Sequence, residues 1–127
     1  MDLRTEFSRP PDIVIADDDW YIRDVLENYL ANAGCQVRAF PNGELAWQAV
    51  QEQPPDLMLL DINMPKMDGL SVCRQIKGDA STQFIPVVIV TALDSQDDEL
   101  IAIEACADDF ITNPFSSIIL LTRVRSL

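Results

Sequence analysis

Five short apolar runs, with helix-patterned segments between them, constrain the fold of this chain more than any other feature. The runs lie at residues 12–16, 36–40, 56–60, 86–91 and 108–112. Apolar residues recur every three or four positions in the segments that follow, at about 19–33, 43–52, 69–78, 95–105 and 116–127. Strands joined by helices predict an α/β fold with a parallel sheet, because each parallel connection needs a long crossover.

The composition of the apolar runs predicts the order of the strands. "IVIA", "LMLL" and "PVVIV" are continuously apolar, as expected of inner strands that are covered on both faces. "QVRAF" and "DDFIT" mix polar and apolar residues, as expected of edge strands. With right-handed crossovers, this difference favours the strand order 2-1-3-4-5, numbered along the chain. The predicted fold is a doubly wound, five-stranded parallel sheet with five helices, of the flavodoxin-like type.

Acidic residues dominate the charge of the chain and exclude some classes of partner. Twenty-one Asp and Glu against nine Lys and Arg give a net charge of −12. Nucleic acids and anionic membranes are bound through clustered cations, so neither is an expected partner. No apolar stretch approaches the roughly 18 residues of a membrane-spanning helix, and the first residues lack the apolar core of a signal peptide. We expect a cytoplasmic protein with an N-terminal extension, 1–11, before one domain, 12–127.

The three cysteines favour core positions over a disulfide framework or a zinc site. Cys35, Cys73 and Cys106 are odd in number and widely spaced, and they form no Cys-x-x-Cys pair. The chain has no histidine to complete a zinc site. This cysteine usage fits a reducing compartment.

Carboxylates follow two of the predicted inner strands. Asp17 and Asp18 follow the first strand, and Asp61 follows the third. In the predicted order these strands are neighbours at the switch point of the sheet, where ligands of such folds bind. Two carboxylates about 4 Å apart repel by about 4 kcal/mol at an effective dielectric constant of about 20. Bound Mg²⁺, a hard cation with oxygen ligands, would offset this repulsion.

Aspartates at strand ends have a simpler interpretation, which is that they cap helices and turns. For one aspartate that interpretation would be preferred, but three that converge on the switch point favour a metal site. Asp19 is expected to face away from the metal and to serve the first helix as its N-cap. Thr91 ends the fourth strand, where its hydroxyl either caps a turn or donates to a bound anion. Asn113 follows the fifth strand and precedes a proline.

These segments together resemble the receiver domain of two-component response regulators, across residues 12–127. The matching stretches are "IVIADDD", "DLMLLDINMPKMDGL", "IPVVIVTA" and "ADDFITNPF", in the order and at the spacing of that family. The stretch "VCRQIKGD…IPVVIVTALDS" and the ending "LLTRVRSL" are most similar to receivers that precede diguanylate cyclase (GGDEF) output domains.

The resemblance implies a regulatory module rather than a turnover enzyme, with defined roles for its residues. Asp61 would accept a phosphoryl group from a histidine kinase or phosphotransfer protein. Mg²⁺ would be held by Asp17, Asp18, Asp61 and the backbone carbonyl of Asn63. Thr91 would donate to the phosphoryl group, and Phe110 would be the switch aromatic. A homodimer would form through the fourth helix, the fifth strand and the fifth helix.

Three departures from the family pattern put the switching in doubt. Asn113 stands where the family has a lysine, and an amide offers only a neutral hydrogen bond to a phosphoryl group. Lys66 and Lys77 flank the third predicted helix and are not placed to substitute. Cys106 stands where the family usually has glycine, and Phe110 lacks a tyrosine hydroxyl.

Other functions stay open at this point. A degenerate pseudo-receiver would act as a docking or dimerisation module without productive phosphorylation, as the replacement of lysine by Asn113 suggests. A haloacid-dehalogenase-type phosphatase would need an acid two residues after its nucleophile, where this chain has Asn63. A flavin binder would need a loop rich in glycine and hydroxyl groups, where "DDDW" would repel phosphate.

Overall fold

A five-stranded parallel sheet forms the centre of the molecule in the computed structural model, which describes residues 9–62, 64, 66–91, 107–112 and 116–126. The strands are β1 (Asp12–Ala16), β2 (Gln36–Phe40), β3 (Leu57–Asp61), β4 (Val87–Thr91) and β5 (Asp109–Thr112). The helices are α1 (Trp20–Asn32), α2 (Gly43–Glu52), α3 (Gly69–Gly78) and α5 (Ser117–Ser126). Each lies within a residue or so of its predicted range. The helix predicted at 95–105 lies outside the described residues.

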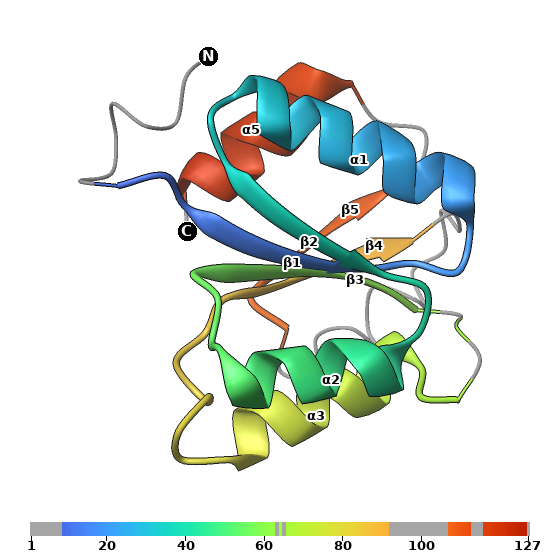
Figure 1. Ribbon diagram of the computed structural model, residues 1–127, viewed down its shortest axis with the longest axis vertical. Helices are drawn as coiled ribbons and strands as arrows, with labels where there is room; N and C mark the ends of the chain where they lie inside the picture. The colour runs from blue at the N-terminus through green and yellow to red at the C-terminus, as the bar shows by residue number, and fades with distance from the viewer. Residues whose placement is uncertain (1–8, 63, 65, 92–106, 113–115, 127) are drawn as a thin grey trace.

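The strand order is β2-β1-β3-β4-β5, which confirms the prediction and the doubly wound fold class. Helices α1 and α5 cover one face of the sheet, and α2 and α3 cover the other (Figure 1). All five residues of β1 are buried, whereas those of β2 are exposed or half-buried. The composition of the strands therefore predicted correctly which strands lie inside the sheet and which lie at its edges.

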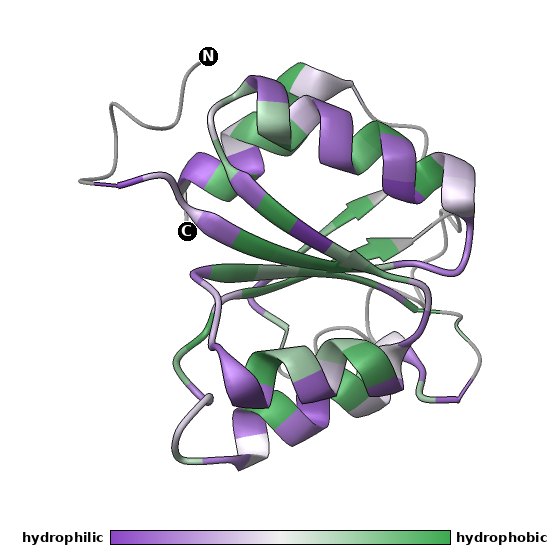
Figure 2. Cartoon of the chain, in the orientation of Figure 1, coloured by the Kyte–Doolittle hydropathy of each residue, from purple (hydrophilic) through white to green (hydrophobic). Residues whose placement is uncertain are grey.

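Two apolar layers hold the helices on the sheet. Ile13, Ile15, Leu59 and Val88 face α1 and α5, whereas Val14, Met58 and Ile89 face α2 and α3. Hydrophobic residues follow the inner strands, and hydrophilic residues gather on the helices (Figure 2). Cys73 is fully buried in the second layer, as predicted. None of the helices within the described ranges is long and apolar enough to cross a membrane.

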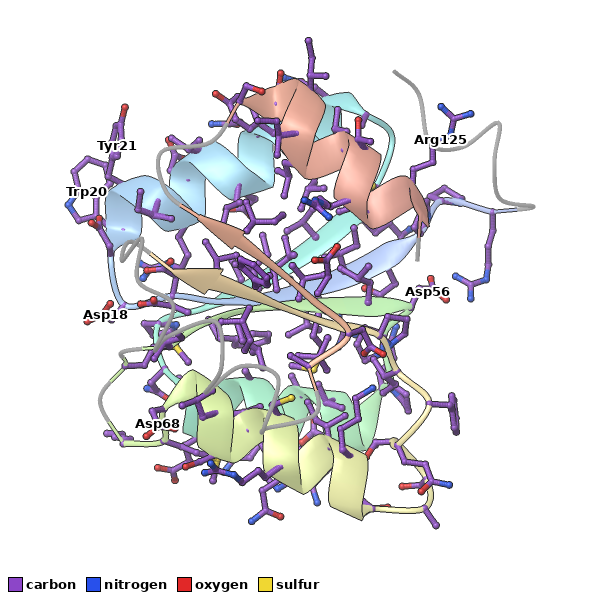
Figure 3. All side chains as sticks on the ribbon, turned by 180° about the vertical axis from the view of Figure 1, so that it is seen from behind. Asp18, Trp20, Tyr21, Asp56, Asp68 and Arg125 are labelled. Atoms are coloured by element: carbon purple, nitrogen blue, oxygen red, sulfur yellow. The ribbon has the colours of Figure 1, made fainter. Side chains whose placement is uncertain are left out.

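Ion pairs stabilise the end of the sheet at which the strands begin. Arg38 of β2 donates two hydrogen bonds to the buried Asp12 carboxylate, at 3.1 and 2.8 Å. Arg9 donates two more to Asp56, at 2.7 Å each, and Asp56 also accepts from the Asp12 backbone amide at 2.7 Å. Bidentate pairs of this kind fix geometry as well as charge. In Figure 3 this edge, marked by Asp56, lies at the far end of the molecule from Asp18.

Gly43 lets α2 begin directly against the loop that precedes α3. A Cβ atom at this position would overlap the Met67 carbonyl oxygen and would lie 2.7 Å from Val72 Cγ2. Asn42 caps the helix by accepting a hydrogen bond from the Leu45 amide at 2.9 Å. The close approach of α2 to this loop therefore requires glycine, which has no side chain, at position 43.

We predict that Gly43→Ala lowers the free energy of unfolding by about 1–3 kcal/mol, because backbone atoms must move to admit the methyl group. Gly78→Ala is the matched control, since a Cβ atom there meets nothing within 4 Å. That control should be neutral or stabilising by at most about 1 kcal/mol, the helix preference of alanine. Urea denaturation of both variants measures the difference. Equal effects at the two positions would contradict the packing argument.

Candidate functional site

Three aspartates meet where β1 and β3 end. In the parallel register Ala16 lies beside Leu60, so the residues that follow, Asp17 and Asp61, lie at the same edge of the sheet. One carboxylate oxygen from each of Asp17, Asp18 and Asp61 lies within 4.8 Å of the others. Asp17 is buried, Asp61 is half-buried and Asp18 is exposed. The structure thus brings these three predicted residues together.

The turn from β1 into α1 is held by hydrogen bonds on every side of Asp17. Its amide donates to the Phe40 carbonyl at 3.1 Å, and its carboxylate accepts from the Asp19 amide at 2.9 Å. The Arg23 guanidinium donates to the Asp17 carbonyl at 2.7 Å. Asp19 caps α1 by accepting from the Tyr21 amide at 2.9 Å, which confirms its predicted role. Asp18 is exposed, and it lies below Trp20 and Tyr21, the first residues of α1, in the view of Figure 3.

Burial raises the pKa of Asp17 to about 6. The hydrogen bond from the Asp19 amide lowers this pKa, the charges of Asp18 and Asp19 raise it, and Arg23 lowers it. A carboxyl group with a raised pKa resists the negative charge that it carries at neutral pH. The metal-free site therefore stores unfavourable electrostatic energy.

The donor set fits a hard divalent cation. All three ligands are carboxylate oxygens, and their spacing allows one ion to contact each of them. Binding of such a cation would remove the repulsion among the three charges. Asp17, Asp18 and Asp61 are the described residues that would hold Mg²⁺. Asn63, whose carbonyl is the fourth predicted ligand, lies outside the described residues.

Gly69 packs the start of α3 against the strand end that carries Asp61. Its amide donates to the Ile62 carbonyl at 3.1 Å, and a Cβ atom here would overlap the Asp61 carbonyl oxygen. Asp68 caps the helix through the Ser71 amide at 2.8 Å. This contact was not predicted from the sequence, although glycine at the first position of a helix, in "MDGL", is a signal of close backbone approach.

Of the remaining predicted residues, the structure describes the backbone of Thr91 and the position of Phe110. Asp61 pairs with Val90, so the backbone of Thr91 ends β4 at the same edge as the aspartates. Phe110 lies in β5 beside Ile89 and is half-buried against the layer under α2 and α3. Asn113 lies outside the described residues, as does Cys106.

Lys77 is engaged near the first residues of β4 and β5, at the other end of the strands from the aspartates. Its ammonium donates to the Ile85 carbonyl and to the Asp108 carboxylate, both at 2.8 Å. Asp108 also accepts from the amide of Val87, the first residue of β4. Lys77 is therefore not placed to act at the aspartate cluster.

We predict that Asp17→Asn stabilises the metal-free protein at neutral pH and not at low pH. The folded-state pKa of about 6 exceeds the ordinary value of 3.8, so folding favours the protonated form. The ionised carboxyl thus costs stability above about pH 6, the cost declines as the pH falls, and it is absent below about pH 4. Asparagine keeps the acceptor for the Asp19 amide and removes the charge.

The expected gain is about 1–3 kcal/mol near pH 7.5 and close to zero near pH 4. Thermal unfolding in EDTA at the two pH values measures it. Asp24→Asn, on the exposed side of α1, controls for the change in net charge. A gain at Asp17 that is the same at both pH values would contradict the prediction.

Comparisons with known proteins agree with this geometry. Residues 13–125 match the model of the response regulator receiver domain. The transcriptional regulatory protein GltR of Pseudomonas aeruginosa is 39% identical over 115 residues, which are 91% of this chain and 48% of GltR. The response regulator PleD of Caulobacter vibrioides is 40% identical over 115 residues, which are 91% of this chain and 25% of PleD.

A solved structure has the same fold at moderate identity. It is the signal receiver domain of a signal transduction histidine kinase from Syntrophus aciditrophicus, with a TM-score of 0.85 and 34% identity. The match covers 91% of this chain and 88% of that one. The chain therefore spans about half the length of GltR and a quarter of the length of PleD. Receiver domains are regulatory rather than catalytic modules, and this chain belongs to the receiver domain family of two-component response regulators.

Proposed function

We propose that this receiver is a phosphoacceptor, which takes a phosphoryl group on Asp61 and thereby regulates an output domain or a partner protein. The donor is a histidine kinase or a phosphotransfer protein. Mg²⁺ is the cofactor, held by Asp17, Asp18, Asp61 and the backbone carbonyl of Asn63. The observation that carries the proposal is the convergence of three carboxylates at one edge of the sheet, in a chain of this family.

The transfer is a displacement at phosphorus. A carboxylate oxygen of Asp61 forms the new P–O bond while the P–N bond to the donor imidazole breaks, and the imidazole leaves with the electron pair. Asp61 suits this role because it ends a buried strand, so its position is fixed while its side chain remains half-exposed. Bound Mg²⁺ supplies positive charge that offsets the charges of the nucleophile and the phosphoryl group. Thr91 is proposed to donate its hydroxyl to a phosphoryl oxygen.

The output and the compartment are proposed from the sequence. The stretch "VCRQIKGD…IPVVIVTALDS" and the ending "LLTRVRSL" are similar to receivers that precede GGDEF domains. This similarity favours a diguanylate cyclase as the output domain. GltR and PleD, at nearly equal identity, do not discriminate between kinds of output. Exposed Ile118 and Ile119 on α5 are consistent with a homodimer through the fourth helix, β5 and α5. We propose a cytoplasmic location from the cysteine usage and the nature of the donor.

The second candidate is a degenerate receiver that docks or dimerises without productive switching. Asn113 in the place of the family lysine is the specific observation in its favour. The family assignment argues against a haloacid-dehalogenase-type phosphatase and a flavin binder.

We predict that incubation with acetyl phosphate and Mg²⁺ adds the mass of one phosphoryl group, and that Asp61→Asn abolishes the increment. Asp17→Asn should only reduce it, because a ligand is weakened while the nucleophile remains. Intact-mass spectrometry measures the product, and omission of Mg²⁺ should suppress it. An increment that survives Asp61→Asn would assign the acceptor elsewhere, and no increment in the wild type would favour the degenerate receiver.

We predict that the phosphorylated wild type changes conformation little, and that Asn113→Lys enlarges the change. A neutral hydrogen bond contributes about 0.5–1.5 kcal/mol, against about 1.5–3 kcal/mol for one to a charged group. A shift from mostly inactive to mostly active needs several kcal/mol of differential binding. Backbone amide shifts with and without beryllofluoride, a phosphoryl mimic, measure the change around Thr91 and Phe110. Large shifts in the wild type that Asn113→Lys leaves unchanged would refute the argument.

A further inference from the structure

Arg23 is an unusual residue for its place in α1. It lies in the first turns of the helix, where its own amide donates to the Asp19 carbonyl at 3.0 Å. The positive end of the helix dipole disfavours a cation there and favours acidic residues. The first turn of α1 nevertheless contains no acidic residue, and the cation follows it directly. Some other interaction must therefore favour the arginine at this position.

That interaction is with the turn that carries the metal-binding aspartates. One guanidinium nitrogen of Arg23 lies 2.7 Å from the Asp17 carbonyl oxygen, and the side chain is half-buried against the turn. The positive charge is therefore held beside Asp17 rather than in bulk water. A partly buried charge is screened less by salt than an exposed one. The carboxylate of the same residue, Asp17, has an oxygen within 4.8 Å of oxygens of Asp18 and Asp61, so the charge of Arg23 is held close to the cluster.

We propose that Arg23 is a positioning residue that also supplies positive charge to the phosphorylation site from the α1 side, in a chain whose strand 5 lysine is replaced by Asn113. This inference rests on the proposed function of Asp61. Arg23 holds the carbonyl of Asp17, and through it the turn, while its charge offsets the negative charge of the aspartates. The same charge opposes the binding of a cation and favours the approach of an anionic phosphoryl donor.

A positive charge at Arg23 has opposite effects on Mg²⁺ binding and on phosphorylation by an anionic donor. Support of the turn by Arg23 would affect both in the same direction. If Arg23 acts through its charge, its removal tightens Mg²⁺ binding and slows phosphorylation. If Arg23 only holds the turn, its removal displaces Asp17 and weakens both. The test therefore measures Mg²⁺ affinity and the phosphorylation rate separately, on the same variants.

The decisive variant is Arg23→Gln, with Arg23→Lys as the rescue and Arg74→Gln as the control. Glutamine removes the charge and keeps an amide donor for the Asp17 carbonyl, whereas lysine keeps both the charge and a donor. Arg74 is an exposed arginine in the middle of α3, further along the helix than Gly69, which lies against the backbone of Asp61. Its replacement changes the net charge of the protein by the same amount.

Mg²⁺ affinity is measured by titration, and phosphorylation by acetyl phosphate at saturating Mg²⁺ is followed by intact mass. For Arg23→Gln we expect the Kd for Mg²⁺ to fall about threefold to tenfold and the phosphorylation rate to fall by a similar factor. Both changes should shrink in about 0.5 M KCl, because salt screens charge but does not repair a turn. Arg23→Lys should stay close to the wild type in both measurements, and Arg74→Gln should leave both unchanged.

Three results would overturn the inference about Arg23 while leaving the proposed function intact. They are weaker Mg²⁺ binding in Arg23→Gln, failure of Arg23→Lys to restore wild-type behaviour, and equal effects of Arg74→Gln. A wild type that binds Mg²⁺ but gains no phosphoryl group would instead refute the proposed function, and the inference with it. The wild-type measurement thus separates the two failures.

Discussion

Repulsion among three carboxylates, enforced by the pairing of two buried strands, is the constraint on which the site depends. Neither β1 nor β3 can slide by one residue to separate Asp17 from Asp61, because the side chains of the two packed apolar layers would then change places. The free energy that the core supplies thus holds like charges together. A divalent cation at this edge would then be bound by an arrangement that already exists in the fold.

The opposite edge of the sheet uses charge in the contrary way. Acids at or next to the first residues of the strands have cationic partners there, in the pairs Arg38–Asp12, Arg9–Asp56 and Lys77–Asp108. The Arg9 guanidinium holds the pKa of Asp56 below its ordinary value, whereas burial holds that of Asp17 above it. The acids of these pairs are therefore stabilised by cations, whereas Asp17 at the other end of the strands is destabilised by its burial. The stabilising ion pairs and the proposed functional site thus lie at opposite ends of the same strands.

The charge balance at the aspartates sets how this receiver would respond to phosphorylation. Asn113 removes the cation that the family pattern places after strand 5, and Lys77 is engaged elsewhere. Arg23 approaches the cluster from α1, on the side of the turn rather than on the side of β5. A charge in that position can assist uptake of a phosphoryl group without pulling on strand 5. Phosphorylation and conformational switching could then be separated in this protein.

The sequence by itself determined the elements, the strand order and the meeting of Asp17, Asp18 and Asp61. Periodicity reports burial along each element, and parallel strands end at one edge, so these features follow from local patterns. Only the tertiary structure decided that Asp17 is the buried member with a raised pKa, that Arg23 holds its carbonyl, and that Gly43 and Gly69 admit close backbone contacts. Such features depend on distances between elements, which are set by how helices and loops pack on the sheet. No periodicity within one segment carries that information.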